Sequence, residues 1–225
     1  MTARAELAAI ADSGAAAFAA LRPPLTAEGR AAAVLMLFGK LDDLPADRSA
    51  EASVVSRDLD VLLVERASTL RAHPGQIAFP GGRIDPGDAS ATDAALREAQ
   101  EETGLDPTGV EVLGALGEVP LERSGHLVTP VLAWWQKPSP VRVVDEAESA
   151  AVFRLPVAEL LDPANRGVTV IRREGHVWRG PAFLIRTEGG ERTLWGFTAM
   201  LLDALFDRLG WTEPWDRTRE LPLVI

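Results

Sequence analysis

The amino-acid sequence predicts an α+β protein, or an α/β sandwich, from two observations. Short apolar runs that suit buried strands are mixed, in irregular order, with segments of helical composition. No internal repeat, heptad series or low-complexity linker interrupts this order. The chain has 225 residues, of which 47% are hydrophobic and 25% charged, and we therefore expect a single domain over residues 1–225.

Apolar runs predict the strands. The first, RAAAVLMLF at residues 30–38, suits a buried strand, and VLLV at 61–64 follows after a polar loop over residues 39–60. Three later runs also suit strands and span residues 110–116, 128–135 and 151–153. The segment 72–87 is dense in glycine and proline, which predicts a structured loop without regular elements.

Four segments predict helices. The alanine- and leucine-rich start ends before Pro23 and gives residues 1–29 the character of a helical extension. A helix over residues 90–103 has clear local boundaries, because Ser90 suits the N-cap and Gly104 suits the C-terminal stop. The other two helices span residues 156–161 and 194–209, and residues 206–225 form a C-terminal tail.

Composition and charge exclude several classes of protein. There is no cysteine, which excludes disulfides, a thiol nucleophile and thiolate metal ligands. Glu6 and Asp12 interrupt the alanine-rich start, and no run approaches the roughly 20 apolar residues of a membrane span, so we expect a cytoplasmic protein without a membrane partner. The formal net charge of −10 repels nucleic acid, and a phosphate-bearing substrate would therefore require a metal and local arginines.

The strongest chemical motif is REAQEETGL at residues 97–105, within a predicted helix. Positions three and four apart share a helix face, so Glu98, Glu101 and Glu102 are expected to project together. These like charges repel one another in the absence of a counter-ion, and oxygen ligands suit Mg²⁺. Arg97 lies just off this face, where it can orient a carboxylate through a bidentate contact. Taken alone, the motif also fits a solvated glutamate-rich face.

The segment before this helix supports the metal interpretation. It reads FPGGRIDPGD, residues 79–88, and ends one turn before the helix. Gly81 and Gly82 allow backbone conformations closed to other residues and close approach to a ligand. A glycine loop of this kind can bring a backbone carbonyl and the helix carboxylates around one metal ion, although glycine pairs also occur in ordinary tight turns.

Together these residues resemble the signature of the Nudix hydrolases, which is a glycine, a short spacer, a glutamate, a longer spacer and R-E-x-x-E-E-x-G. Gly82 and the run from Arg97 to Leu105 match it. Asp88 stands at the first acidic position, with one extra residue between it and Arg97, and its role stays open. The resemblance implies a Nudix fold, an α/β/α sandwich with a mixed β-sheet between helices, here with an N-terminal helical extension.

An upstream motif is similar to that of the coenzyme A pyrophosphatase subgroup. It consists of Leu62-Leu63, Arg66-Ala67, Arg71, Gly75 and Phe79-Pro80-Gly81-Gly82. Val64 is the one clear mismatch, and the extra residue before Arg97 is typical of this subgroup. The resemblance implies Mg²⁺-dependent hydrolysis of coenzyme A, or of a derivative, to 3′,5′-ADP and 4′-phosphopantetheine or acyl-phosphopantetheine.

The resemblance also implies catalytic roles. Glu98, Glu101 and Glu102 are the expected metal ligands, with the Gly82 carbonyl as a further ligand and Mn²⁺ as an alternative ion. Glu98 is in addition a candidate for deprotonating the attacking water. Glu148 is a second candidate base, for which an ordinary acidic surface turn is the alternative explanation.

Substrate binding is assigned to arginines and to the glycine turn. Arg66 and Arg71 are expected to supply positive charge for the coenzyme A phosphates, because a planar guanidinium suits phosphate oxygens. Either side chain is alternatively a surface ion-pair partner. Gly81 and Gly82 allow the backbone to approach the nucleotide.

Two alternative functions stay open. A Nudix enzyme for another nucleoside diphosphate derivative, such as ADP-ribose, NADH or a dinucleoside polyphosphate, would use the same metal helix with a different outer pocket. A Nudix-fold binding module without catalysis belongs to a different class, and the three intact glutamates argue against it. The sequence leaves the oligomeric state open, a homodimer included.

Overall fold

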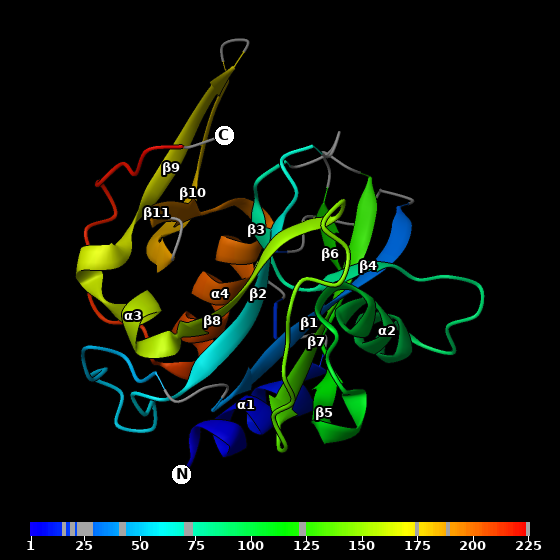
Figure 1. Ribbon diagram of the computed structural model, residues 1–225. Coiled ribbons are helices and arrows are strands. Elements are labelled where there is room, and N and C mark those ends of the chain that lie inside the picture. The colour runs from blue at the N-terminus through cyan, green and yellow to red at the C-terminus, as the bar shows by residue number, and fades with distance from the viewer. Residues whose placement is uncertain are drawn as a thin grey trace.

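The computed structural model describes residues 1–14, 17–18, 21, 29–40, 44–69, 74–121, 125–173, 176–187 and 190–223. Two β-sheets and the helices packed against them make up this part of the chain (Figure 1). The arrangement confirms the predicted α+β class, with a mixed sheet between helices and a helix at the amino terminus. Of the helices described, none combines the length and the apolar character that crossing a membrane requires.

The larger sheet is built around a parallel central pair. β1 (Arg30–Gly39) runs parallel to β7 (His126–Trp135), and the other pairings described in this sheet are antiparallel. Three strands extend the sheet outward, namely β2 (Asp60–Arg66), β5 (Val110–Ala115) and β8 (Ser149–Pro156). Three short strands complete it, namely β3 (Ile77–Ala78), β4 (Gly81–Arg83) and β6 (Val119–Leu121).

The side chains of β1 divide between two cores. Leu35 and Leu37 pack toward α2 (Ala91–Thr103), whereas Met36 and Phe38 pack into the core on the opposite face of the sheet. Successive side chains of a strand point to opposite faces, so both faces of β1 are buried. A strand buried on both faces reads as a continuous apolar run, which is how β1 appears in the sequence.

Small side chains hold α2 against the larger sheet. Ala94, Ala95 and Ala99 have no exposed surface and pack in the core between this helix and the strands. The Ser90 hydroxyl accepts a hydrogen bond from a first-turn N–H, and Gly104 ends the helix in the left-handed conformation, as predicted. Alanine allows the helix to approach the sheet closely, which brings its glutamates within reach of the turn that precedes it.

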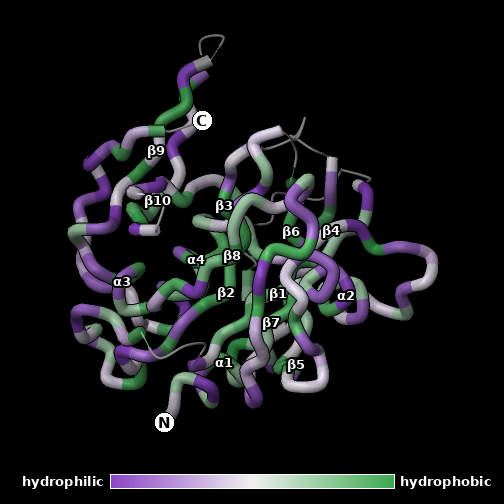
Figure 2. The backbone as a smooth tube through the Cα atoms, viewed as in Figure 1, coloured by the Kyte–Doolittle hydropathy of each residue, from purple (hydrophilic) through white to green (hydrophobic). Residues whose placement is uncertain are grey.

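Two helices and a second sheet cover the opposite face of the larger sheet. The helices are α1 (Ala3–Asp12) and α4 (Gly196–Leu209). The second sheet is antiparallel and contains β9 (Arg166–Arg173), β10 (His176–Thr187) and β11 (Gly190–Leu194). The short α3 (Val157–Leu161) follows β8, and 3-10 turns lie at Pro107–Gly109 and Pro163–Asn165. Figure 2 shows hydrophobic residues gathered along the strands between these layers.

The amino-terminal helix and the start of the C-terminal tail pack into the same core. The indole N–H of Trp211 donates to Glu6 of α1 at 2.7 Å, and Trp211 and Leu7 are both buried. Further along the tail, the buried Glu213 accepts a hydrogen bond from the Arg48 guanidinium at 2.7 Å. Both segments are therefore part of the packed structure.

Several predicted elements need correction. The prediction of a loop without regular elements over residues 72–87 is wrong, because β3 and β4 form there by pairing with β2 and β1. The last helix begins at Gly196, since Leu194 pairs with Phe183 in the second sheet. The sequence does not predict β6 or the second sheet, whose strands are short or carry arginines and threonines that interrupt an apolar run.

Candidate active site at the carboxylate helix

Glu102 is the most buried carboxylate of α2. Its exposed fraction is 7%, and its Oε2 accepts a hydrogen bond from the Gly81 N–H at 3.0 Å. Burial raises the pKa of Glu102 to about 7, because the charged form loses hydration. The Gly81 N–H and the Arg66 charge lower this pKa, and the nearby Glu98 and Glu148 carboxylates raise it. The position therefore favours a proton or a cation beside Glu102.

Close contacts fix both glycines of the preceding turn. A Cβ on Gly82 would lie 2.5–2.6 Å from the carboxylate atoms of Glu98. A Cβ on Gly81, whose φ is 156°, would overlap the carbonyl oxygen of Ala33 in β1. Because the turn presses against Glu98, burial raises the pKa of that carboxylate, and the Arg97 guanidinium opposes this change.

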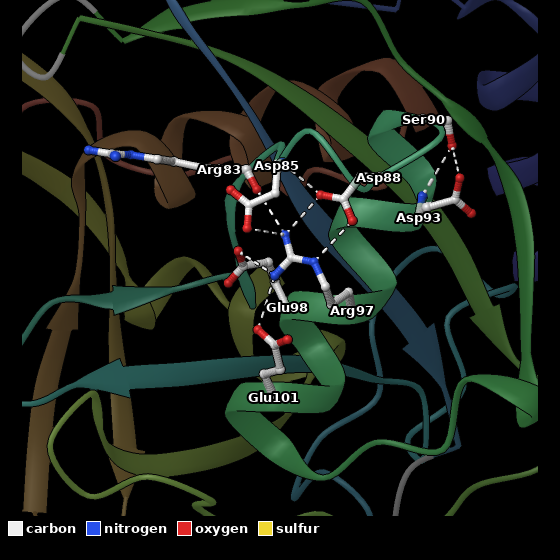
Figure 3. Close-up of polar contacts among 8 residues, drawn as sticks. All are labelled: Arg83, Asp85, Asp88, Ser90, Asp93, Arg97, Glu98 and Glu101. Carbon is white, nitrogen blue, oxygen red and sulfur yellow. Dashed lines mark hydrogen bonds and ion pairs between the residues drawn. The ribbon is translucent and has the colours of Figure 1, made fainter.

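Arg97 connects the turn to three carboxylates (Figure 3). Its Nε and Nη2 donate to Asp88 at 3.0 and 2.9 Å, and its Nη1 donates to Glu98 and Glu101 at 3.0 Å each. Its Nη2 also donates to the carbonyl oxygen of Arg83 at 3.1 Å. The contact with Asp88 is the main reason that the pKa of Arg97 is raised, and the same contact lowers the pKa of Asp88.

Asp88, whose role the sequence left open, has a structural role in the turn before α2. Its carboxylate forms a bidentate pair with Arg97 and accepts the Asp85 N–H at 2.8 Å. Asp88 therefore anchors the arginine and closes the turn between β4 and α2. This role depends on the folded path of the turn, which the spacing of the motif does not reveal.

The three glutamate side chains have different partners, although Glu98 and Glu101 share the Arg97 Nη1. Glu102 turns to the Gly81 N–H, Glu98 lies against Gly82, and the Glu101 side chain stays 59% exposed beside Arg97. Among the described residues, no group of three or more acidic or histidine side chains is arranged to hold a metal ion. The oxygen-only donors and the buried Glu102 nevertheless have the chemistry that a hard cation requires.

Glu148 and Arg66 lie near Glu102, at the end of β2. Arg66 pairs with Ser149 across the β2–β8 ladder, and the Ala67 N–H donates to the Glu148 carbonyl oxygen at 2.9 Å. The charges of both side chains act on the pKa of Glu102. The Arg66 Nε is buried and has no hydrogen-bond partner among the described residues. The fold thus brings two residues singled out from the sequence to the same carboxylate.

Two further residues bear on the predicted site. Arg71, the other arginine expected to bind substrate, lies outside the described residues. Arg83 is absent from the predicted site, although it directly follows the glycine pair and is exposed. The sequence feature that draws attention to Arg83 is its adjacency to Gly82.

The chain is similar to known proteins of one family. A family model described as the NUDIX domain matches residues 47–177. The chain is 40% identical over 150 residues to the uncharacterized Nudix hydrolase NudL of Escherichia coli K12, an alignment that covers 67% of this chain and 75% of that protein. It is 46% identical over 121 residues to the protein of the same description from Cronobacter sakazakii. That alignment covers 52% of this chain and 62% of the relative, which is less than two thirds of its length.

A solved structure is also similar to this chain. The crystal structure of a Nudix hydrolase from M. smegmatis, RenU, shares 25% sequence identity and has a TM-score of 0.41. The aligned part covers 56% of this chain and 70% of that structure.

Proposed function

The chain belongs to the Nudix hydrolase family, and we propose that it hydrolyses the pyrophosphate bond of coenzyme A or of one of its derivatives. The observation that carries the proposal is the continuity between the upstream motif and the carboxylate helix. The described part of the motif from Leu62 to Gly82 includes residues of β2, β3 and β4, and Gly82 lies against the Glu98 carboxylate. This contact supports the proposal that the two motifs contribute to one site.

In the proposed reaction, the oxygen of a water molecule attacks one phosphorus of the pyrophosphate. The new P–O bond forms while the bond from that phosphorus to the bridging oxygen breaks, and the water protons pass to the base and the solvent. Coenzyme A then yields 3′,5′-ADP and 4′-phosphopantetheine, and an acyl derivative yields acyl-phosphopantetheine. No covalent enzyme intermediate is required, so the protein contributes mainly positioning and electrostatic stabilisation.

Nudix hydrolases generally use a divalent metal, and we assign Mg²⁺, or Mn²⁺, to the oxygens of Glu98, Glu101, Glu102 and the Gly82 carbonyl. The buried Glu102 supports this assignment, because its charged form lacks hydration and is stabilised by a cation. Glu101 has to leave Arg97 to join these donors. When bound, the ion supplies neutralisation of the pyrophosphate oxygens and acidification of a water molecule.

We assign the general base to Glu148 in preference to Glu98. Glu98 lies against Gly82 and Arg97, within the proposed metal-binding set. Glu148 comes from a separate segment, is exposed to solvent, and lies close enough to Glu102 to affect its pKa. A carboxylate outside the metal-binding set keeps the acceptor capacity that proton removal from water requires.

Arg66 and Arg71 are assigned to the substrate phosphates. Arg66 lies near Glu102 and its charge lowers the pKa of that carboxylate, which supports a position beside the proposed pyrophosphate. Arg97 is unsuited to this task, because three carboxylates and a backbone carbonyl already occupy its guanidinium. The backbone of Gly81 and Gly82 lies beside the carboxylates and borders the proposed position of the pyrophosphate.

The test is a substrate panel with Mg²⁺, containing coenzyme A, ADP-ribose, NADH and diadenosine polyphosphates, with products resolved by chromatography. We expect release of 3′,5′-ADP from coenzyme A at the highest kcat/KM of the panel. Glu98→Gln should lower that value by about 100-fold or more. Glu191→Gln changes an exposed glutamate of β11 in the same way and should retain the wild-type value.

The other outcomes separate the alternatives. Preference for another compound of the panel would retain the hydrolase and reject coenzyme A as its substrate. Absence of turnover, together with absence of Mg²⁺ binding by titration calorimetry, would reject the hydrolase and favour a binding module.

A further inference from the structure

We infer that Arg83 binds a phosphate monoester of the substrate, outside the position assigned to the pyrophosphate. The choice of ligand rests on the proposed function. Arg83 is the last residue of β4 and directly follows Gly82, so it lies at the border of the proposed active site. Its side chain is exposed.

The strand directs Arg83 away from the carboxylate helix. The Cβ direction of Gly82 leads to the Glu98 carboxylate on α2. Successive residues of a strand point to opposite faces, so Arg83 leaves β4 on the face that does not meet α2, in register with Ala32 of β1. Figure 3 shows its side chain extended away from Arg97 and from the carboxylates that Arg97 contacts. One strand therefore separates the carboxylates from an arginine side chain.

The guanidinium of Arg83 makes no hydrogen bond or ion pair with the residues that the structure describes. Acidic groups are close along the chain, but Asp88 and Glu98 accept hydrogen bonds from Arg97, and Asp85 lies 3.9 Å from the same arginine. In a chain with a net charge of −10, an exposed arginine without an acidic partner at the border of a site is available to an anion.

The chemistry of coenzyme A identifies that anion. The molecule carries a 3′-phosphate in addition to its pyrophosphate, and the 3′-dephospho form lacks it. The pyrophosphate is assigned to the carboxylate side of β4, so the phosphate that remains for Arg83 on the other side is the monoester. A guanidinium matches two phosphate oxygens with parallel N–H donors, and the match gives affinity as well as selectivity.

The first experiment compares kcat/KM for coenzyme A and for 3′-dephospho-coenzyme A at fixed Mg²⁺. Arg83→Ala should lower the ratio of the two values by about tenfold or more, because a charged hydrogen-bonding pair is lost with one substrate only. The change should appear mainly in KM, and Arg83→Lys should restore part of the ratio. Arg186→Ala removes an exposed arginine from β10 and should leave the ratio unchanged.

The second experiment needs no turnover and separates this inference from the proposed function. Titration calorimetry should show that the wild type binds 3′,5′-ADP about tenfold more tightly than 5′-AMP, and that Arg83→Ala loses this preference. If the wild type hydrolyses neither coenzyme A nor 3′-dephospho-coenzyme A, the proposed function fails. The calorimetry still decides the role of Arg83. Equal binding of the two nucleotides by the wild type, or an Arg83→Ala variant that behaves like Arg186→Ala, would overturn the inference.

Discussion

The carboxylate of Glu98 occupies the space that a side chain at Gly82 would need, with a separation of 2.5–2.6 Å from an added Cβ. This obstacle is the mobile end of a long side chain. At the neighbouring Gly81 the obstacle is the backbone of β1, where an added Cβ would overlap Ala33 and approach the Val34 Cα to 2.7 Å. We therefore expect the two glycines to be required for different reasons, Gly82 for the chemistry of the proposed site and Gly81 for the fold.

Gly82→Ala should preserve the fold and impair hydrolysis. The Glu98 side chain can rotate away from the new methyl group, and φ at Gly82 is not positive, so the free energy of unfolding should change by less than about 1 kcal/mol. Displacement of the Glu98 carboxylate should lower kcat/KM for coenzyme A by about 100-fold. Urea denaturation and steady-state kinetics on the same sample check both parts. A fully active alanine variant would show that the contact has no catalytic role.

Gly81→Ala should destabilise the protein. The clash is with backbone atoms of a buried strand, and the φ of 156° is unfavourable for alanine, so we expect a loss of about 2 to 4 kcal/mol in the free energy of unfolding. Urea denaturation beside the Gly82→Ala variant measures the difference. Equal stability of the two variants would contradict the assignment of Gly81 to the fold.

Glu102→Gln should stabilise the metal-free protein at high pH. The pKa of Glu102 is raised from its ordinary value of 4.5 to about 7, so the folded state holds the proton more tightly than the unfolded state. Wild-type stability should therefore fall as pH rises from about 4.5 to about 7, whereas glutamine cannot ionise. The free energy of unfolding of the variant should exceed that of the wild type by about 2 to 3 kcal/mol at pH 8. The two values should be equal near pH 4.

Urea denaturation in EDTA at several pH values measures this difference. In excess Mg²⁺ at pH 8 the wild type should be more stable than Glu102→Gln, because the wild type gains binding energy that the variant lacks. A difference that does not depend on pH would show that the Glu102 carboxylate is not perturbed by burial.

Glu148→Gln should lower kcat for coenzyme A hydrolysis by about 100-fold or more. The reason is that glutamine cannot accept a proton from water. Glu146→Gln is the matched control, since Glu146 is exposed in the same turn and has no assigned role. Both variants should be measured with the wild type at the same pH and the same Mg²⁺ concentration. A Glu148→Gln variant that keeps the wild-type kcat would remove this residue as the base.

The carboxylate helix was predictable almost to the residue because its boundaries are local. Ser90 and Gly104 act on backbone groups within one turn, and the predicted helix over residues 90–103 agrees closely with Ala91–Thr103. The central strand β1 was predictable for a related reason. Burial on both of its faces leaves a continuous apolar run in the sequence.

Other features depend on partners that are distant in the sequence. β4 forms by pairing with residues 32–34 of β1, whereas its glycines and proline-rich surroundings resemble a loop in the sequence. The buried Glu102 carboxylate accepts a hydrogen bond from the Gly81 N–H, whereas helical spacing alone places this side chain on the same face as Glu98. The role of Asp88 likewise requires the path of the turn that brings it to Arg97.

The parallel pairing of β1 with β7 has a consequence for how the protein is made. This pairing joins Arg30 to His126, so both β4 and α2 are synthesised before the strand that completes the centre of the sheet. Val131 and Ala133 of β7 form part of the core beneath α2, and the helix lacks this support until they emerge from the ribosome. A contact between such distant segments also forms slowly, because the intervening chain must be ordered first. A nascent chain that ends before β7 would thus contain the whole glutamate motif without a folded active site to hold it.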